Sequence, residues 1–277
     1  MTDKNKNLII RLVSGLTLLP GVLYLLYLGG WWSAGLLGFA AGACAWEYLD
    51  ITLKKPFTPV AWLTVVLAAA MPILPIAMPF QANALISGAT GFVLFSAWAW
   101  HLLRGPLPEA PQRTAHLLMA FIYGHGGLTA LAALRNVPDH GLMWVVSALV
   151  ITWGNDTMAY FAGRLFGKHK LYPEVSPNKT WEGFAGGFVG AIGFLFLQRA
   201  FFFPEMRVID CFILGGLGSL LGPAGDLCES MLKRAYGVKD SGVIIPGHGG
   251  MLDRIDALIF NAPMVYLYVQ FGRAWLS

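Results

Sequence analysis

Charged residues are scarce in this chain of 277 residues, and their scarcity excludes most soluble folds. Asp, Glu, Lys and Arg together make up 12% of the sequence, whereas an ordinary soluble domain has roughly 25%. Hydrophobic residues make up 56%, which is more apolar surface than a soluble fold of this length can bury. The composition therefore predicts an integral membrane protein, which must be built of helices or of a closed barrel.

Cysteine is also rare, and its placement argues against a thiolate metal site. Cys44, Cys211 and Cys228 are far apart and show no metal-ligand spacing, so we interpret them as small packed residues. The chain also lacks internal repeats, low-complexity tracts and any segment with the composition of a soluble domain. We therefore expect a single membrane domain over residues 1–277.

Long apolar runs are abundant. A membrane-spanning helix needs about 20 apolar residues, and nine stretches qualify: 9–29, 31–50, 59–79, 83–103, 114–134, 142–163, 182–202, 208–228 and 254–275. The fold class predicted is thus all-α, a polytopic membrane protein with about nine transmembrane helices. Basic residues precede the first run as in a signal peptide, but the run lacks a small-x-small exit, so we expect a retained helix.

The basic residues predict an orientation. With nine helices and a cytoplasmic N-terminus, 15 of the 19 Lys and Arg residues fall on the cytoplasmic side. Only four fall outside, namely Arg135, Arg199, Arg207 and Arg273. This asymmetry agrees with the positive-inside rule, so we expect the C-terminus outside. Because the cations lie in short cytoplasmic loops, their expected partners are lipid headgroups and phosphate substrates, not nucleic acid.

The two halves of the sequence differ in character. Residues 1–140 are apolar with short loops and are expected to form mainly a helical scaffold. Residues 141–277 carry acids and cations beside glycines in three blocks, all expected at the cytoplasmic side. Charges near a membrane are costly and usually functional, so this half is the candidate catalytic half.

One block lies around Asp226. Asp226, Glu229, Ser230 and Lys233 stand at i, i+3, i+4 and i+7 and share one helical face. The preceding Gly222, Pro223 and Gly225 are expected to loosen the helix and open backbone groups toward a polar cavity. A salt-bridged helix end, in which Lys233 pairs with one of the acids, is the alternative.

A second block runs from residue 247 to 256. Asp253 and Asp256 lie one turn apart at the start of the last helix, where carboxylates also favour the helix dipole. Together with Asp226 they offer oxygen ligands that suit Mg²⁺ better than zinc. The glycine-rich turn around His248 would let backbone N–H groups approach an anion.

The third block contains Asp156 within a helix and Lys179 in a loop, Ser176–Gly183. These two residues are the candidates for substrate contact in this region. Arg164, Lys168 and Lys170, by contrast, are interpreted as membrane anchors at the cytoplasmic face.

The segment 230–256 resembles the signature of the CDP-diacylglycerol synthase (phosphatidate cytidylyltransferase) family. The residues that stand at the family's spacing are Ser230, Lys233, Arg234, Lys239, Asp240, Gly242, Pro246, His248, Gly249, Gly250, Asp253, Arg254 and Asp256. The resemblance implies a Mg²⁺-dependent nucleotidyltransferase of phospholipid biosynthesis, in which phosphatidate attacks the α-phosphate of CTP to give CDP-diacylglycerol and pyrophosphate. It is also compatible with a homodimer and leaves open a second cation.

The expected roles follow from this resemblance. Asp226 and Asp253 would bind the metal, and Asp256 would support them. Lys239 and His248 complete the catalytic set. The expected substrate-binding residues are Lys233, Arg234, Ser230, Gly249, Gly250, Arg254, Asp156 and Lys179.

Two other functions remain open from the residues alone. Intramembrane acids and a proline-interrupted helix are also typical of ion-coupled transporters, although no inverted repeat is visible. Membrane aspartates with Mg²⁺ also serve enzymes that move a sugar phosphate onto a polyprenyl phosphate. We favour the cytidylyltransferase, in a bacterial-type cytoplasmic membrane with its site facing the cytoplasm.

Overall fold

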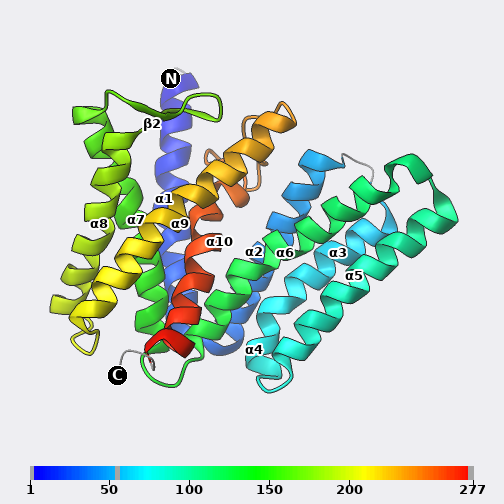
Figure 1. Ribbon diagram of the computed structural model, residues 1–277, viewed down its shortest axis with the longest axis horizontal. Helices are drawn as coiled ribbons and strands as arrows, with labels where there is room; N and C mark the ends of the chain where they lie inside the picture. Colours follow the sequence, from blue (N-terminus) through cyan, green and yellow to red (C-terminus); the bar gives the residue numbers. More distant parts are fainter. Residues whose placement is uncertain (1–2, 54–56, 274–277) are drawn as a thin grey trace. The chain divides into compact units, whose positions relative to one another are not determined.

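The computed structural model describes residues 3–53 and 57–273, with side chains from Ser14 onward. All nine expected apolar stretches are helical within these ranges (Figure 1). The chain divides into two compact units. The first contains residues 1–136 and 236–254, and the second contains residues 137–235 and 255–277.

The first unit is a layer of long helices. Its elements are α1 (Asp3–Leu28), α2 (Gly30–Thr52), α3 (Pro59–Ala70), a 3₁₀ turn (Met71–Ile73), α4 (Leu74–Ala77), α5 (Ala82–Arg104), a 3₁₀ turn (Leu107–Glu109) and α6 (Ala110–Arg135). α2, α3, α5 and α6 pack side by side (Figure 1). The 3₁₀ turn lies where Pro72 and Pro75 remove helical N–H donors, as the prolines predict.

The second unit contains α7 (Gly141–Phe166), β1 (Lys170–Tyr172), β2 (Ser176–Thr180), α8 (Trp181–Phe201) and α9 (Val208–Ala235). It also receives most of α10 (Leu252–Leu267) and the π turn Tyr268–Gly272. α8 packs closely on α7 because glycines line the contact. A Cβ at Gly183 would lie 2.9 Å from the carbonyl oxygen of Ala159, and one at Gly190 would lie 2.9 Å from that of Gly154. Small residues permit such approach between membrane helices.

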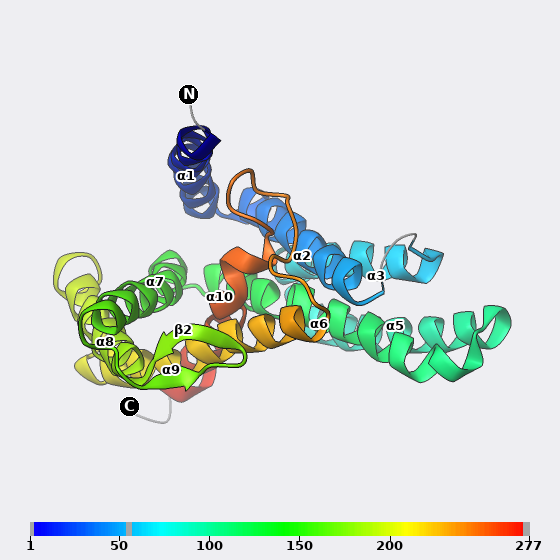
Figure 2. The same ribbon diagram turned by 90° about the horizontal axis from the view of Figure 1, so that it is seen from above.

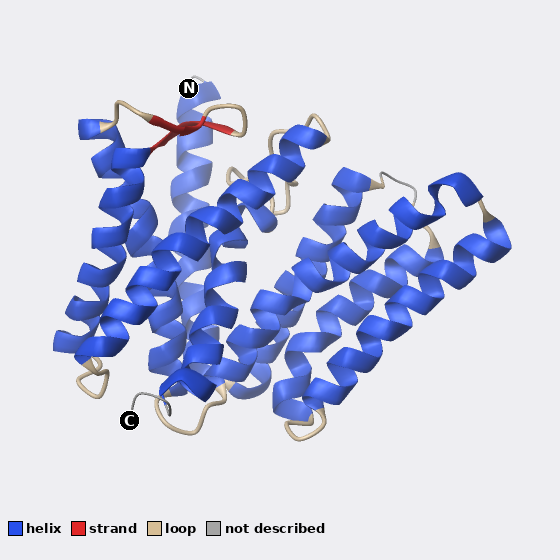
Figure 3. Ribbon diagram, viewed as in Figure 1, coloured by secondary structure: helices blue, strands red, loops and turns tan. Residues whose placement is uncertain are grey.

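A two-stranded hairpin interrupts the helical fold (Figure 3). β1 and β2 are antiparallel, with Lys170 opposite Thr180 and Tyr172 opposite Ser176. Thr180 then caps α8, because its hydroxyl accepts a hydrogen bond from the N–H of Gly183 at 3.1 Å. The sequence predicted only a loop here, since so short a polar segment shows no alternation. The hairpin connects the end of α7 to the start of α8, and in the view from above it lies over part of α9 (Figure 2).

Within residues 3–53 and 57–273, five helical segments are long and apolar enough to cross a membrane: Pro59–Ala77, Ala82–Arg104, Leu107–Arg135, Trp181–Phe201 and Val208–Ala235. The chain is thus an all-α protein of the multi-pass membrane class, apart from the hairpin. Nine spans, and the orientation of the termini, stay predictions.

Candidate functional site

A cavity of about 490 Å³ opens in the second unit, between the hairpin and helices α7, α8 and α9. We call it the carboxylate cavity. Its charged residues are Asp156 on α7, Arg164 on α7, Lys179 on β2 and Asp226 on α9. Apolar and aromatic side chains form much of the remaining wall, including Tyr160, Leu171 and Phe184. The cavity therefore has a charged end and an apolar surface.

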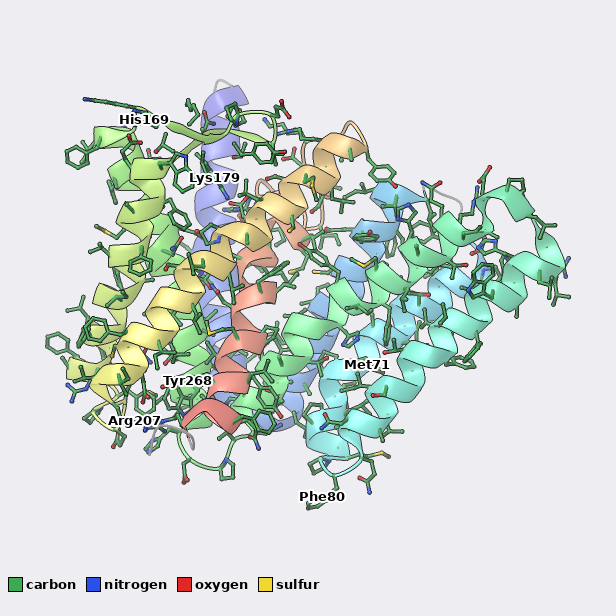
Figure 4. All side chains as sticks on the ribbon, viewed as in Figure 1. Met71, Phe80, His169, Lys179, Arg207 and Tyr268 are labelled. Atoms are coloured by element: carbon green, nitrogen blue, oxygen red, sulfur yellow. The ribbon has the colours of Figure 1, made fainter. Side chains whose placement is uncertain are left out.

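The ion pair between Lys179 and Asp226 joins the hairpin to α9. Lys179 Nζ lies 2.7 Å from Asp226 Oδ2, and the two side chains are 24% and 35% exposed. The hydroxyl of Ser230, one turn further along α9, donates to Asp226 Oδ1 at 3.2 Å. Figure 4 shows Lys179 on the hairpin, at the opposite end of the unit from Arg207 and Tyr268. Three predicted site residues thus meet here.

Two further carboxylates lie close to Asp226. The negative charge of Asp226 acts on both Asp156 and Asp256, and Lys179 offsets it at both. Three acids therefore share one end of the unit with two cations, Lys179, which is bonded to Asp226, and Arg164. Such an excess of negative charge is favourable for a divalent cation.

A complete ligand cluster is not preformed. In the part of the chain that the structure describes, no three His, Cys, Asp or Glu side chains are grouped as metal ligands. Mg²⁺, however, is usually held by one or two carboxylates together with substrate phosphates and water. The oxygen donors of the carboxylate cavity fit that mode of binding.

α9 is continuous through Pro223, so the expected opening of this helix is not observed. The glycines around it serve a different purpose. A Cβ at Gly225 would lie 2.6 Å from the carbonyl oxygen of Asp256, and one at Gly222 would lie 3.0 Å from Asn261 Nδ2. These two glycines let α10 approach α9, which brings Asp256 toward Asp226.

Lys233 and Arg234, the two predicted phosphate contacts at the end of α9, have different surroundings. Lys233 is buried, and its Nζ lies 2.5 Å from Glu229 Oε2. This is the salt-bridged alternative that the sequence left open for Lys233. Arg234 is exposed on the last turn of the helix.

The middle of the segment 230–256 forms a turn in the first unit, which we call the glycine loop (residues 241–252). Gly247 and Gly249 have φ angles of 76° and 88°, which favour glycine. The N–H of Ile245 donates to the carbonyl of Gly249 at 2.9 Å, and the N–H of His248 donates to that of Ile245 at 2.9 Å. The backbone of the loop is therefore well ordered by its own hydrogen bonds.

The glycine loop borders a cavity of about 440 Å³. Asp240, His248 and Arg254 provide its charged or titratable side chains, and Gly247 and Gly249 line it with backbone. The ring of His248 is also within 2.9 Å of the hydroxyl of Ser14 on α1. Lys239 is exposed and lines a neighbouring cavity of about 520 Å³. An imidazole and a guanidinium around a glycine turn suit an anion.

Asp253 braces the glycine loop. Its Oδ2 accepts hydrogen bonds from the N–H of Ser241 and the N–H of Gly250, both at 2.9 Å. The hydroxyl of Ser241 also lies 3.0 Å from this oxygen. Asp253 thus binds N–H groups of the loop that precedes α10 and not the first N–H groups of the helix itself. Asp253 belongs to the first unit and Asp226 to the second. That the two bind one metal ion stays a prediction.

Glu47 is the residue whose role the sequence did not reveal. It lies among apolar residues in the C-terminal part of α2. In the structure it is only 2% exposed and accepts hydrogen bonds from both ends of the glycine loop. The available signal was an acid within an apolar helix, three residues before the other acid of α2, Asp50.

Most predicted site residues therefore gather in two places. Asp156, Lys179, Asp226, Ser230 and Asp256 gather in the second unit, and Lys239, His248, Gly249, Gly250, Asp253 and Arg254 belong to the glycine loop or its flanks in the first. The expectation that residues 1–140 act mainly as scaffold thus omits the role of α2, which holds this loop.

Fold and site together define a multi-pass membrane protein with carboxylates and cations in one cavity and a glycine turn beside another. The profile of the cytidylyltransferase family matches residues 9–272, and the chain belongs to this family. The resemblance read from the segment 230–256 is thereby confirmed.

Several curated relatives carry the name phosphatidate cytidylyltransferase. The one from Bacillus subtilis is 46% identical over 133 residues, which are 48% of this chain and 49% of the relative. Those from Staphylococcus saprophyticus and Haemophilus influenzae are 42% identical over 151 residues and 45% identical over 136 residues. These matches cover 54% and 47% of this chain, and 57% and 47% of the two relatives. The chain thus spans about half the length of the curated relatives it matches.

Proposed function

We propose that this protein transfers the cytidylyl group of CTP to phosphatidate, giving CDP-diacylglycerol and pyrophosphate for phospholipid synthesis. The observation that carries the proposal is the family match over residues 9–272, joined to relatives named phosphatidate cytidylyltransferase. The transporter and the polyprenyl-phosphate transferase receive no comparable support.

The chemistry requires little general-base catalysis. A phosphomonoester has a second pKa near 6, so the phosphatidate oxygen is already ionised at neutral pH. That oxygen forms a bond to the α-phosphorus of CTP while the bond from this phosphorus to the bridging oxygen of pyrophosphate breaks. The protein must bring two polyanions together and stabilise charge on the leaving group.

Each unit contributes candidates for this task. Lys179 in the carboxylate cavity, His248 in the glycine loop and Arg254 just after it would bind phosphate oxygens. Lys239 and Arg234 are exposed and could reach a substrate phosphate. Lys233 is buried in its pair with Glu229 and would instead orient the face of α9.

Mg²⁺ is the proposed cofactor, and when bound it would neutralise charge on the phosphates. Asp226 is the principal candidate ligand, with Asp156 and Asp256 close to it. The sequence prediction of Asp253 as a second ligand is retained, although its Oδ2 is already engaged by the glycine loop. A second cation beside Mg²⁺ would be accommodated by the same excess of carboxylates.

The proposed setting is a bacterial cytoplasmic membrane, with nine spans, the N-terminus inside and the active site facing the cytoplasm. The relatives are bacterial, and the charged residues of both cavities come from segments that the positive-inside rule assigns to the cytoplasm. Labelling of single cysteines introduced at positions 139 and 168, on opposite predicted sides, tests this orientation in sealed vesicles.

The decisive experiment is an assay of purified protein in detergent with labelled CTP, phosphatidate and Mg²⁺. The proposal expects a labelled liponucleotide, release of pyrophosphate and no product after chelation. Absence of product in active-site-intact protein, or ion flux in vesicles without CTP, would favour a transporter. Release of a nucleoside monophosphate from a nucleotide sugar would favour the polyprenyl-phosphate transferase.

A further inference from the structure

Glu47 connects helix α2 to the glycine loop, more than 190 positions further along the chain. Its Oε1 accepts a hydrogen bond from the N–H of Met251 at 2.9 Å, and its Oε2 accepts one from the N–H of Leu252 at 2.8 Å. The hydroxyl of Ser241 donates to Oε2 at 3.0 Å. One carboxylate therefore holds the residue that begins the loop and the two residues that end it.

These contacts also complete the N-terminus of α10. The first N–H groups of a helix have no partner within the helix, and α10 begins at Leu252. Glu47 satisfies the N–H groups of Met251 and Leu252 from outside the helix, while Asp253 binds back to Gly250. Negative charge at this end of a helix is favourable. The start of α10 and the glycine loop are thus fixed by the same two acids.

At both ends of the loop, a glycine lies directly against the carboxylate of Glu47. A Cβ at Gly242 would lie 2.5 Å from Glu47 Oε1, and one at Gly250 would lie 2.6 Å from Oε2. Real Cβ atoms do not approach oxygen so closely, so neither position admits a side chain while Glu47 stays in place. The close packing against the carboxylate is therefore enough to explain why these two positions are glycine, without a contact to a substrate.

We infer that Glu47 is a positioning residue, whose carboxylate closes the glycine loop and so presents His248 and Arg254 to their common cavity. The kind of ligand in this cavity follows from the proposed function, and in that respect the inference rests on it. The effect of Glu47 on the loop follows from the hydrogen bonds alone. Glu47 itself donates no proton and holds no substrate in this role.

Glu47→Gln tests the inference, because glutamine keeps the size but offers one acceptor oxygen where the loop requires two. Hydrogen exchange measured by mass spectrometry should become faster in peptides covering residues 241–252 and stay unchanged in those of α5 and α6. In the CTP assay we expect catalytic efficiency to fall roughly 10- to 100-fold, as for other residues that orient a site from behind. The KM for one of the two substrates should rise while the KM for the other stays the same.

Glu109→Gln is the matched control, because it makes the same chemical change in the same unit at an exposed ion pair with Arg113. It should leave both exchange in the loop and kinetics unchanged. If Glu47→Gln does not yield folded protein, Ser241→Ala removes one donor to the same carboxylate and should accelerate exchange in the same peptides.

The results of these experiments support or overturn the role of Glu47 as follows. Uniform acceleration of exchange over the chain, or a lower kcat with both KM values unchanged, would mean that Glu47 serves only general stability and would overturn the inference. Unchanged exchange in residues 241–252 would overturn it as well. If the wild-type protein makes no liponucleotide, the proposed function fails, and the exchange experiment still tests the role of Glu47.

Discussion

The substitution Asp226→Asn tests whether the carboxylate of Asp226 has a catalytic role or only a structural one. The substitution keeps the side-chain shape and an oxygen to accept the hydrogen bond from Ser230, but it removes the charge that pairs with Lys179 at 2.7 Å. Because both partners of that ion pair are partly exposed, its loss should cost about 1 kcal/mol of stability or less. The protein should therefore still fold and insert.

The effect on activity should be much larger. If Asp226 holds the divalent ion, its neutralisation removes an electrostatic contribution to the transition state that is typically worth about 3–4 kcal/mol, or 10²- to 10³-fold in kcat. The assay is CTP incorporation into lipid over a Mg²⁺ titration, with thermal unfolding in detergent measured on the same samples. The Mg²⁺ dependence should shift to higher concentration.

Asp139→Asn is the control for this experiment, because it makes the same change at an exposed residue of the same unit, before the start of α7. It should leave activity and its Mg²⁺ dependence unaltered. Wild-type kcat and an unshifted Mg²⁺ titration in Asp226→Asn would refute the assignment of this residue to the metal. A loss of activity matched by an equal loss of folded protein would refute it too.

Two further predictions concern packing. Gly225→Ala should destabilise the protein by roughly 1–3 kcal/mol in detergent unfolding, because its Cβ would lie 2.6 Å from the Asp256 carbonyl oxygen and force α10 away from α9. The control is Gly193→Ala, where a Cβ meets open space, so this substitution should be neutral or slightly stabilising. Equal effects of the two substitutions would contradict this reasoning. Tyr268→Phe removes the hydroxyl that donates to buried Asp210 at 2.6 Å, so it should lower thermal stability by about 1–3 kcal/mol. The substitution should leave kcat intact, because Asp210 and Asp226 are 16 residues apart on α9, or about 24 Å. A large loss of kcat in a stable variant would show that this end of the unit contributes to catalysis.

The helices could be predicted well because they depend on a local property. A run of about 20 apolar residues is sufficient to define a membrane helix, and each of the nine runs is helical in the structure. Prolines were less informative. Pro72 ends α-helical geometry as expected, whereas Pro223 lies inside a continuous helix. The neighbouring elements can compensate for the lost hydrogen bond in one place and not in another.

The candidate site could be predicted as a set of residues but not as an arrangement. The spacing of Asp226 and Ser230 on one helical face predicted their contact, which is observed. Nothing in the spacing indicated that Lys179 would pair with Asp226. The pair of Lys233 with an acid one turn away was only one of two alternatives, and the structure has it with Glu229. Several cations lie near each acid in such a sequence, and only packing selects among them.

By itself the sequence determined that the chain is a helical membrane protein, that its polar chemistry is concentrated in three blocks, and that it carries the signature of a cytidylyltransferase. Only the tertiary structure decided which acids meet and which brace the backbone. Glu47 is the clearest case, because it holds a loop 204 positions away at Met251. Apolar run length and local spacing are written in neighbouring residues, whereas a hydrogen bond between distant segments exists only after the helices have packed.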